Sequence, residues 1–381
     1  GLGGIALVLF GLLVFTGVLM MFVYDPSPER AWQSIDSFER HTLFGGLVRG
    51  VHFWSANLLL PVVLLHLARV FLTGGYQGNR KRNWHIGLGT GFFVILSGFT
   101  GYLLPWDQTA YWAITICTEM LGQVPGIGSA LKSAVIGGSE IGSATTVNFY
   151  ALHVAVTPFA LVALLSWHFW LVRTTGGVVL PTARPSEAGK IVSFSPDLLI
   201  REAVVTAVVV ALVLVLAAGL GAPLGDPANP GVSPNPAKAP WYFMGLQELL
   251  IHVDALFAVI VVPACVVAFL IAAPYLCREP EPTGDWFLTT KGRRLAIVAA
   301  LSALVLVPLF VVVDELAIAP FALLAVVIAA FYFLVRRMFA PTQNEMVQTM
   351  FVLLFVSFVA LTITGIWFRG AGMSLVWPWQ I

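Results

Sequence analysis

Residues 49–66 read RGVHFWSANLLLPVVLLH, an apolar stretch in which His52 and His66 stand fourteen residues apart. A later apolar stretch carries His153 and His168 at a spacing of fifteen. On an α-helix these spacings advance by about 1400° and 1500°, close to whole turns, so the members of each pair share a face and lie roughly 21 to 22 Å apart. Each of the two helices therefore presents one histidine near each of its ends.

The composition of the chain calls for a membrane environment. Of its 381 residues 59% are hydrophobic and only 10% are charged, and the mean hydropathy of +0.90 is far outside the usage of soluble proteins. A formal net charge of +1 leaves no basic surface for nucleic acid and no acidic tail. The cysteines Cys117, Cys265 and Cys277 form no CxxC or CxxCH motif, so no iron–sulfur or covalent c-type haem motif is present.

Nine stretches are apolar over about the 20 residues that a helix needs to cross the hydrocarbon core. We predict an all-α integral membrane protein, because lipid offers no partner to unpaired backbone groups. An N-terminal four-helix bundle is followed by four or five further transmembrane helices. The predicted spans are residues 2–24, 44–71, 86–106, 149–172, 203–220, 255–276, 295–313, 319–335 and 346–368.

The loops predict a domain boundary and an orientation. The stretch 174–197 is rich in glycine and proline, which favours a boundary between residues 1–198, the four-helix bundle, and residues 199–381, a C-terminal transmembrane domain. Basic residues gather in alternate loops, beginning with Arg80, Lys81 and Arg82. The positive-inside rule orients those loops towards the cytoplasm, which defines the inner face. The long loops 25–39, 107–146 and 221–254 then lie on the outer face.

The four histidines predict two metal sites. Histidine within a membrane is costly and usually functional. The second and fourth spans run in the same direction, so His52 can face His153 near the outer face and His66 can face His168 near the inner face. Two bis-histidine sites stacked across a helix bundle suit low-spin haem iron. Hydrogen bonding between helices is the alternative for a single histidine, but four at this spacing favour ligation of two haem b groups.

Arginines and glycines near these histidines support the haem interpretation. Arg49 and Arg69 each lie three residues from a histidine on the side of the membrane surface, where an arginine can pair with a haem propionate; placement of the charge at the helix end is the alternative. Four glycines repeat the fourteen-residue spacing and leave room for a flat macrocycle, although close helix packing also selects glycine. They are Gly3, Gly17, Gly87 and Gly101. The other histidines, His41, His85 and His252, have no spaced partner and are predicted not to be ligands.

With these residues in view, the chain resembles the cytochrome b subunit of the Rieske/cytochrome b complexes, the bc type of respiration and the bf type of photosynthesis, in a fused single-chain form. The resemblance rests on the histidine pairs and on four motifs. These are RGVH at 49–52, TGGY at 73–76, GYLLPWDQ at 101–108 and PAKAPWYF at 236–243. The fifteen-residue histidine step is similar to the photosynthetic branch, and the fused C-terminal half is similar to the respiratory one.

The resemblance implies a quinol:cytochrome c-type oxidoreductase in the cell (inner) membrane. Quinol would be oxidised at the outer face, with one electron passing to a partner Rieske iron–sulfur protein and a c-type cytochrome. The other electron would cross two haems to a quinone at the inner face, coupled to proton translocation. A homodimer within a larger complex is implied, and the C-terminal domain would complete the outer quinol site. The implied quinone-binding residues are Tyr102, Trp106, Asp107, Pro240, Trp241 and Tyr242 outside, and Arg201 and Glu202 within the segment 193–202 inside.

Three departures from the family pattern matter. Gly1 stands where the bf branch has the cysteine of an extra covalent haem, so we predict no covalent haem. Asn148 replaces a common arginine before the third ligand. The Pro-Glu-Trp-Tyr motif reads Ala239-Pro240-Trp241-Tyr242, without its carboxylate.

Another group must therefore accept the quinol proton. We predict Glu248 as the catalytic base beside Tyr242, because it follows Trp241 by two helical turns. Burial in its apolar surroundings is expected to raise its pKa. A helix cap or salt bridge is the structural alternative for Glu248, and His252, Asp254 and Asp107 are the other candidates.

Two rival functions remain open from sequence. One is a dihaem membrane anchor that only exchanges electrons between quinone and a dehydrogenase. The other is a transporter whose intramembrane histidines relay protons without haem. The loop around Trp241 and Tyr242 argues against the first, and a haem spectrum would separate the second.

Overall fold

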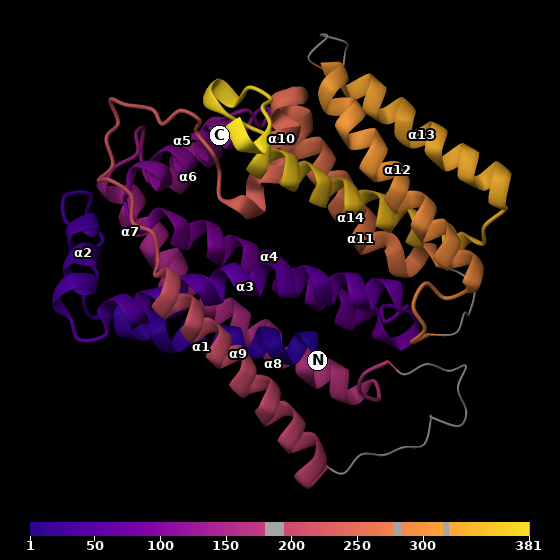
Figure 1. Cartoon of the computed structure of the whole chain (residues 1–381), viewed down its shortest axis with the longest axis horizontal. Helices are drawn as coiled ribbons and strands as arrows, with labels where there is room; N and C mark the ends of the chain where they lie inside the picture. The colour runs from indigo at the N-terminus through magenta and orange to yellow at the C-terminus, as the bar shows by residue number, and fades with distance from the viewer. Residues whose placement is uncertain (180–193, 278–282, 315–319, 381) are drawn as a thin grey trace.

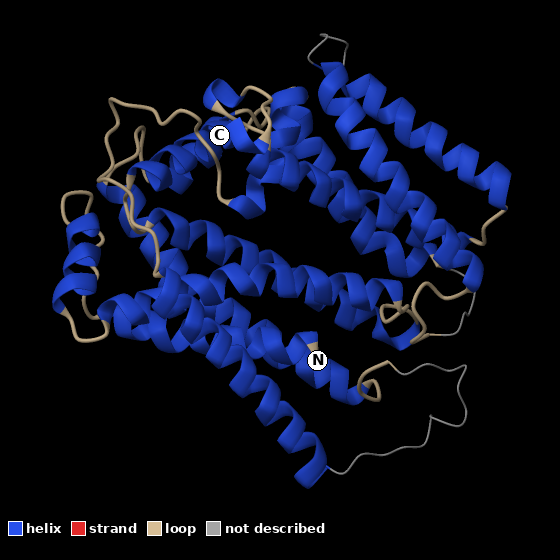
Figure 2. Ribbon diagram, in the orientation of Figure 1, coloured by secondary structure: helices blue, strands red, loops and turns tan. Residues whose placement is uncertain are grey.

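The computed structural model describes residues 1–179, 194–277, 283–314 and 320–380. Within these ranges the fold is helical, and β-structure is limited to two isolated bridges (Figure 2). Nine described helices are long and apolar enough to cross a membrane. The predicted all-α membrane architecture with nine spans is confirmed. Several helices begin earlier than predicted: the third span starts at Lys81, and the helical run of the fourth starts at Ser143.

The N-terminal bundle is formed by α1 (Leu2–Met21), α3 (Gly45–Leu72), α4 (Lys81–Leu103) and α8 (Thr157–Thr174) (Figure 1). Its central core is apolar because each helix contributes buried aliphatic side chains. These include Leu9, Leu59, Val94 and Leu161. Helix α9 (Leu199–Leu220) joins the same core through Val213 and Ala217. It approaches α3 closely because Gly50 lies against Ala217, where a Cβ would be only 3.0 Å from the alanine methyl.

The fourth span contains one widened turn at the outer histidine. Helix α7 (Ser143–Ala151) continues through Leu152–Val156, where the Thr157 amide donates to the Leu152 carbonyl five residues back, and then into α8. Such a π-type turn absorbs one extra residue. It therefore explains why the fifteen-residue histidine step of this span matches the fourteen-residue step of α3.

Short helices cap the outer face of the bundle. They are α2 (Ala31–His41), α5 (Gln108–Gly122), α6 (Gly128–Ile136) and α7. Leu103, Trp106, Ile114 and Phe149 form the apolar core beneath them. Asp107 fixes the start of α5, because its Oδ1 accepts a hydrogen bond from the Ala110 amide at 2.8 Å.

The C-terminal part begins with the turn Trp241–Phe243 and α10 (Met244–His252). After α11 (Val262–Leu276) and α12 (Thr290–Asp314), helix α13 (Pro320–Phe339) packs alongside α12 at the edge of the molecule (Figure 1). The last span, α14 (Gln343–Trp367), starts with a reciprocal cap in which Thr342 and Glu345 each bond the other's backbone amide. It lies between α10, α11 and α12.

Candidate functional site

The structure brings the four spaced histidines together as two pairs. At the outer level, the ring centres of His52 and His153 are 6.2 Å apart. At the inner level, the ring centres of His66 and His168 are 6.4 Å apart. The pairing expected from the register of the two helices is therefore the pairing that the fold produces.

These separations fit one metal ion between each pair. Two metal–nitrogen bonds of about 2 Å each, in line between two imidazole rings, set the ring centres roughly 6 Å apart. Among the described residues there is no cluster of three or more potential metal-ligating side chains. The candidate metal donors in the described residues are therefore the two histidine pairs. Two histidines are the ligand set of a low-spin haem, whereas a structural zinc site needs four ligands.

Each histidine ring faces a glycine on a neighbouring helix. A Cβ at Gly3 would lie 3.4 Å from the Cε1 atom of His66, and one at Gly17 would lie 3.4 Å from that of His52. The same holds on α4, where Gly87 faces His168 at 3.4 Å and Gly101 faces His153 at 2.5 Å. A side chain at any of these four positions would enter the space beside a ligand ring, so the residues present fit a flat prosthetic group at both levels.

The outer rings have hydrogen-bond partners that sequence reasoning missed. The Nδ1 atom of His52 is 3.0 Å from Thr16 Oγ1. The Nδ1 atom of His153 is 3.0 Å from the Ser97 carbonyl and 3.3 Å from Thr100 Oγ1. If Nε2 held a metal ion, Nδ1 would carry the proton and would donate to these oxygens. The available signal was that a threonine precedes each outer glycine.

The two arginines near the histidines differ in their surroundings. Arg49 is buried, bonds the Glu39 carboxylate, and donates to the carbonyls of Ala222 and Pro223 at 2.9 and 2.7 Å. It thereby ties α3 to α2 and to the loop that follows α9. Arg69 is half-buried near the inner end of α3. Pairing of either arginine with a haem propionate stays a prediction.

The Trp241–Phe243 turn docks on the bundle near the outer histidine level. The Trp241 indole donates to Asn57 Oδ1 at 2.6 Å, and the Tyr242 hydroxyl donates to the Gly98 carbonyl at 3.1 Å. Asn57 lies five residues after His52, and Gly98 lies next to Ser97. Burial raises the pKa of Tyr242, with further contributions from Tyr102 and Cys117 nearby. Tyr242 is therefore a neutral phenol held against α4, close to Tyr102.

The other predicted outer residues have structural contacts of their own. Pro240 is buried beside it. Trp106 packs in the outer core. Asp107 caps α5 and also accepts from the Gly225 amide at 3.0 Å, so its two oxygens are engaged by backbone groups.

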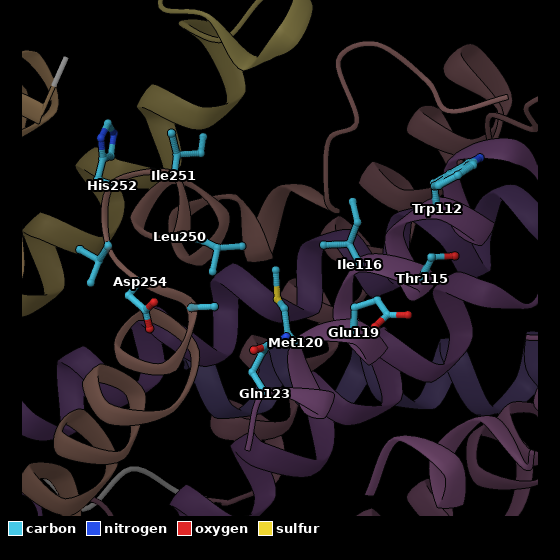
Figure 3. Close-up of a pocket in the computed structure, with 12 residues that line it drawn as sticks. Trp112, Thr115, Ile116, Glu119, Met120, Gln123, Leu250, Ile251, His252 and Asp254 are labelled. Carbon is cyan, nitrogen blue, oxygen red and sulfur yellow. The ribbon is translucent and has the colours of Figure 1, made fainter. Parts of the chain in front are cut away.

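A pocket of about 580 Å³ lies between α5 and the end of α10. In Figure 3, Ile116, Met120 and Gln123 of α5 face Leu250 of α10 across it. The ring of His252 points away from Met120 and Gln123 (Figure 3). The pocket therefore lies at the C-terminal end of α10, and it is lined by neither the Trp241–Phe243 turn nor the paired histidines.

Glu248 occupies a different environment from the one expected. Its side chain is fully buried, and Arg369 donates to it from Nε at 3.0 Å and from Nη2 at 2.6 Å. His252 Nε2 lies 3.1 Å from the same carboxylate. Burial raises the pKa of Glu248, but the hydrogen bonds from His252 and Arg369 and the charge of Arg369 outweigh it, so its pKa lies below the usual value. The expectation of a raised pKa was wrong. The local sequence around Glu248 is apolar and gives no sign of the ion pair with Arg369, which comes from the far end of the chain.

The inner quinone candidates lie at the mouth of the bundle. Arg201 and Glu202 are exposed in the first turn of α9. A Cβ at Gly4 would lie 3.1 Å from the Glu202 carboxylate, and the adjacent Gly3 faces His66. The predicted segment 193–202 is described from Phe194 onwards, and Ser193 lies outside the described residues.

Comparison with known proteins adds independent findings. Residues 1–176 match the family described as Cytochrome b/b6/petB. Over 175 residues the chain is 38% identical to cytochrome b6 of Synechococcus sp. (strain CC9605), covering 46% of this chain and 80% of that protein. Cytochrome b6 of Prochlorococcus marinus (strain AS9601) is equally similar, at 38% identity with the same coverage.

A solved structure described as hyperthermophilic respiratory Complex III is similar over almost the whole chain. The TM-score is 0.70 at 23% sequence identity, with 95% of this chain and 89% of that chain covered. At this identity the similarity concerns the fold, and it includes the C-terminal helices that the b6 sequences do not reach. With the paired histidines, the glycines beside them and these matches, the chain belongs to the cytochrome b/b6 family and is a multi-pass membrane protein that binds haem b and takes part in electron transport.

Proposed function

We propose that this chain is the redox subunit of a quinol:cytochrome c-type oxidoreductase. Quinol is oxidised at the outer face, quinone is reduced at the inner face, and proton release and uptake on opposite faces store energy. Two haem b groups, when bound, would supply one-electron carriers between the faces. In this proposal His52 and His153 hold the outer haem, and His66 and His168 hold the inner one.

The observation that carries the proposal is the pairing of histidines at two levels, with ring centres 6.2 and 6.4 Å apart. A proton relay would need chains of titratable groups between the levels. Between His52 and His66, however, α3 carries apolar residues together with Ser55 and Asn57, and Asn57 Oδ1 accepts from Trp241. Paired rings facing glycines therefore favour a prosthetic group over a transport pathway.

At the outer face, the Trp241–Phe243 turn is proposed to form one wall of the quinol site. Tyr242, a neutral phenol because burial raises its pKa, can donate a hydrogen bond to a quinol oxygen in place of the Gly98 carbonyl. Tyr102, Trp106, Asp107 and Pro240 complete the site. Glu248 as proton acceptor stays a prediction: it would have to leave Arg369 to act, and the structural alternative of a salt bridge fits its contacts better.

At the inner face, Arg201 and Glu202 are proposed to bind the quinone that receives electrons. Both are exposed, and the Glu202 carboxylate lies near the first turn of α1, where Gly3 faces the proposed inner ligand His66. A carboxylate and a guanidinium can bond the quinone oxygens and deliver protons from the inner side.

The electron acceptors at the outer face are proposed to be separate chains. A Rieske iron–sulfur protein and a c-type cytochrome fit this role, within a larger and homodimeric complex. The described part of the chain has no cysteine cluster for an iron–sulfur group. The similar fold of a respiratory Complex III supports the assignment.

The test is a reduced-minus-oxidised spectrum of the purified complex, with haem quantified per chain. We expect two b-type haems, reduced by added quinol, and co-purification of a Rieske protein. Absence of haem would refute the proposal. Haem that exchanges electrons with quinone in a preparation with no Rieske protein would replace it with the dehydrogenase anchor.

A further inference from the structure

A buried polar cluster joins α10 to the end of the last span. Glu248, His252 and Arg369 have exposed fractions of only 0%, 4% and 1%. Glu248 and His252 lie one turn apart on α10, and Arg369 follows the end of α14 by two residues. Arg369 Nη2 is 2.9 Å from His252 Nε2, and its Nη1 donates to the Met373 carbonyl at 3.0 Å.

The contact between Arg369 and Glu248, called the clamp below, is a rigid two-point ion pair. The guanidinium of Arg369 donates to both oxygens of Glu248, a two-point contact that sets direction as well as distance. The backbone around Arg369 is itself fixed by a short hairpin, in which Gly370 donates to Ser374 at 3.0 Å and Val376 donates to Phe368 at 3.0 Å. The clamp therefore links α10 to a constrained segment rather than to a loose end.

The two helices also touch directly through glycines. A Cβ at Gly245 would lie 2.6 Å from Thr362 Oγ1 of α14, and one at Gly365 would lie 3.0 Å from the methyl of Met244. The packing brings the backbones of α10 and α14 close, but small smooth surfaces permit sliding. A directional ion pair at one end of this contact opposes both sliding and rotation of α10.

The position of α10 determines the position of the outer turn. Met244 of α10 directly follows the Trp241–Phe243 turn. Trp241 and Tyr242 reach Asn57 on α3 and Gly98 on α4, close to the outer histidines. A shift of α10 would therefore move the tyrosine hydroxyl relative to the outer histidine level, because the contacts described for this turn are with Asn57 and Gly98.

We infer that Arg369 is a positioning residue for the outer site: by holding Glu248 it sets the depth at which Trp241 and Tyr242 seat against the helices of the outer histidine pair. The inference rests on the proposed function. The contacts described for Arg369 are with Glu248, His252 and Met373, so it acts on the outer site through Glu248 and α10.

The test compares Arg369→Gln and Arg369→Lys with the wild-type complex. Arg369→Gln removes the charge and leaves the buried carboxylate uncompensated, which is strongly unfavourable. We expect the KM for quinol to rise roughly tenfold, the loss expected when one directional contact is removed, with a shifted spectrum or potential of the outer haem and an unchanged inner haem. Arg369→Lys keeps the charge but not the two-point contact, so it should recover part of the KM.

Hydrogen–deuterium exchange gives a readout that does not need turnover. Arg369→Gln should increase exchange in residues 241–252 and leave α1 unchanged. The matched control is Arg40→Gln, which removes an exposed arginine from an ion pair with Asp36 on α2. That control should behave as wild type in every measurement.

A second variant keeps the test open if Arg369→Gln does not fold. In Glu248→Gln with Arg369→Gln neither charge is left buried alone, so the double variant should fold better than the single one. It still lacks the two-point contact and should retain a raised KM. Folded variants with wild-type KM and outer-haem spectrum would overturn the inference, even if their thermal stability falls. Failure of the proposed function would look different, because the wild-type complex itself would lack haem or quinol oxidation.

Discussion

At the outer histidine level each ring has an oxygen within bonding distance of its Nδ1 atom, whereas neither inner ring has such a hydrogen bond in the part of the chain that the structure describes. Thr16 is 3.0 Å from His52, and the Ser97 carbonyl is 3.0 Å from His153. Among the described residues, His168 Nδ1 has no partner at full hydrogen-bond geometry, with only a loose approach from the Asn83 backbone. The ring of His66 also has no hydrogen bond within the described residues.

The difference arises from single residues in a repeated frame. The fourteen-residue register gives both levels the same histidine and glycine positions. The residue before the glycine, however, is Thr16 or Thr100 at the outer level and Leu2 or Ile86 at the inner level. One register therefore builds two sites with the same pair of candidate ligands and different surroundings. The predictions below separate the effect of the register from the effect of the neighbouring side chains.

The largest expected effect is loss of one haem at a single level. His66→Leu or His168→Leu removes one of the two proposed ligands at the inner level, so half of the haem should disappear while the outer half remains. His52→Leu should give the complementary result. Haem content per chain and the reduced-minus-oxidised spectrum measure this. Retention of both haems in an inner variant would mean that the pairing is not the ligand pairing.

A glycine substitution tests the space beside one level. Gly17→Val places a branched side chain against His52, where even a Cβ lies 3.4 Å from Cε1, and should reduce or abolish outer haem incorporation. Gly11→Val is the matched control on the same helix, because nothing lies within 4 Å of a Cβ there. Equal haem content in the two variants would show that Gly17 serves helix packing instead.

The pH dependence of quinol oxidation tests Glu248 at the outer level. Because its pKa is held below the usual value, Glu248 is ionised throughout the neutral range. The ion pair therefore contributes stability above about pH 4.3, the ordinary glutamate pKa, and loses it as pH falls further through the lower folded pKa. Glu248→Gln should lower the rate of quinol oxidation without changing the shape of its profile between about pH 6 and 9.

The outcome of that experiment decides the role of Glu248. Thermal unfolding of the wild type from about pH 3 to 7 should show an acid-dependent loss of stability that Glu248→Gln lacks. If instead the variant loses a limb of the rate profile near neutral pH at unchanged haem content, Glu248 titrates during catalysis and is the proton acceptor.

The contrast between His52 and Glu248 shows what sequence could predict. The histidine pairs, their glycines and the nine spans were predictable because helical periodicity is local and spacing fixes which side chains share a face. The surroundings of Glu248 were not, because its partner Arg369 is 121 positions away and apolar neighbours in sequence suggested an unpaired carboxylate. Trp241 and Asn57 are similarly remote, at 184 positions. The only sign of the widened turn at His153 in the sequence was that His153 and His168 are one residue further apart than His52 and His66.

At the inner level, Glu202→Ala should slow reoxidation of the inner haem by quinone several-fold and leave reduction from the outer side unchanged. The reason is that the Glu202 carboxylate lies beside the first turn of α1, near the glycine that faces His66. Glu29→Ala, which removes an exposed outer-face carboxylate, is the control. Stopped-flow traces at the haem band measure both steps, and unchanged reoxidation in Glu202→Ala would exclude this inner site.

The smallest expected effect tests the comparison itself. Thr16 Oγ1 donates to the Leu12 carbonyl at 2.6 Å, which leaves its lone pairs for the His52 Nδ1 proton. If His52 ligates the outer haem as proposed, this hydrogen bond would make its imidazole a stronger donor to iron and would favour the oxidised state. Thr16→Val keeps the shape and removes the bond. A net loss of about 1 kcal/mol corresponds to roughly 40 mV for one electron, so the midpoint potential of the outer haem should rise by that order.

The same argument predicts the opposite shift when a threonine is added at the inner level. Ile86→Thr places a hydroxyl before Gly87, in the position that Thr100 holds before Gly101, and should lower the inner potential. Thr90→Val is the control, because the hydrogen bond described for the Thr90 hydroxyl goes to the Ile86 carbonyl and not to a histidine ring. If the hydrogen bonds hold the outer haem at the lower potential, electron movement from outer to inner is favourable. Thr16→Val and Ile86→Thr should then each reduce the difference between the midpoint potentials of the outer and inner haems. If redox titrations find this difference unchanged, the threonines are not its cause.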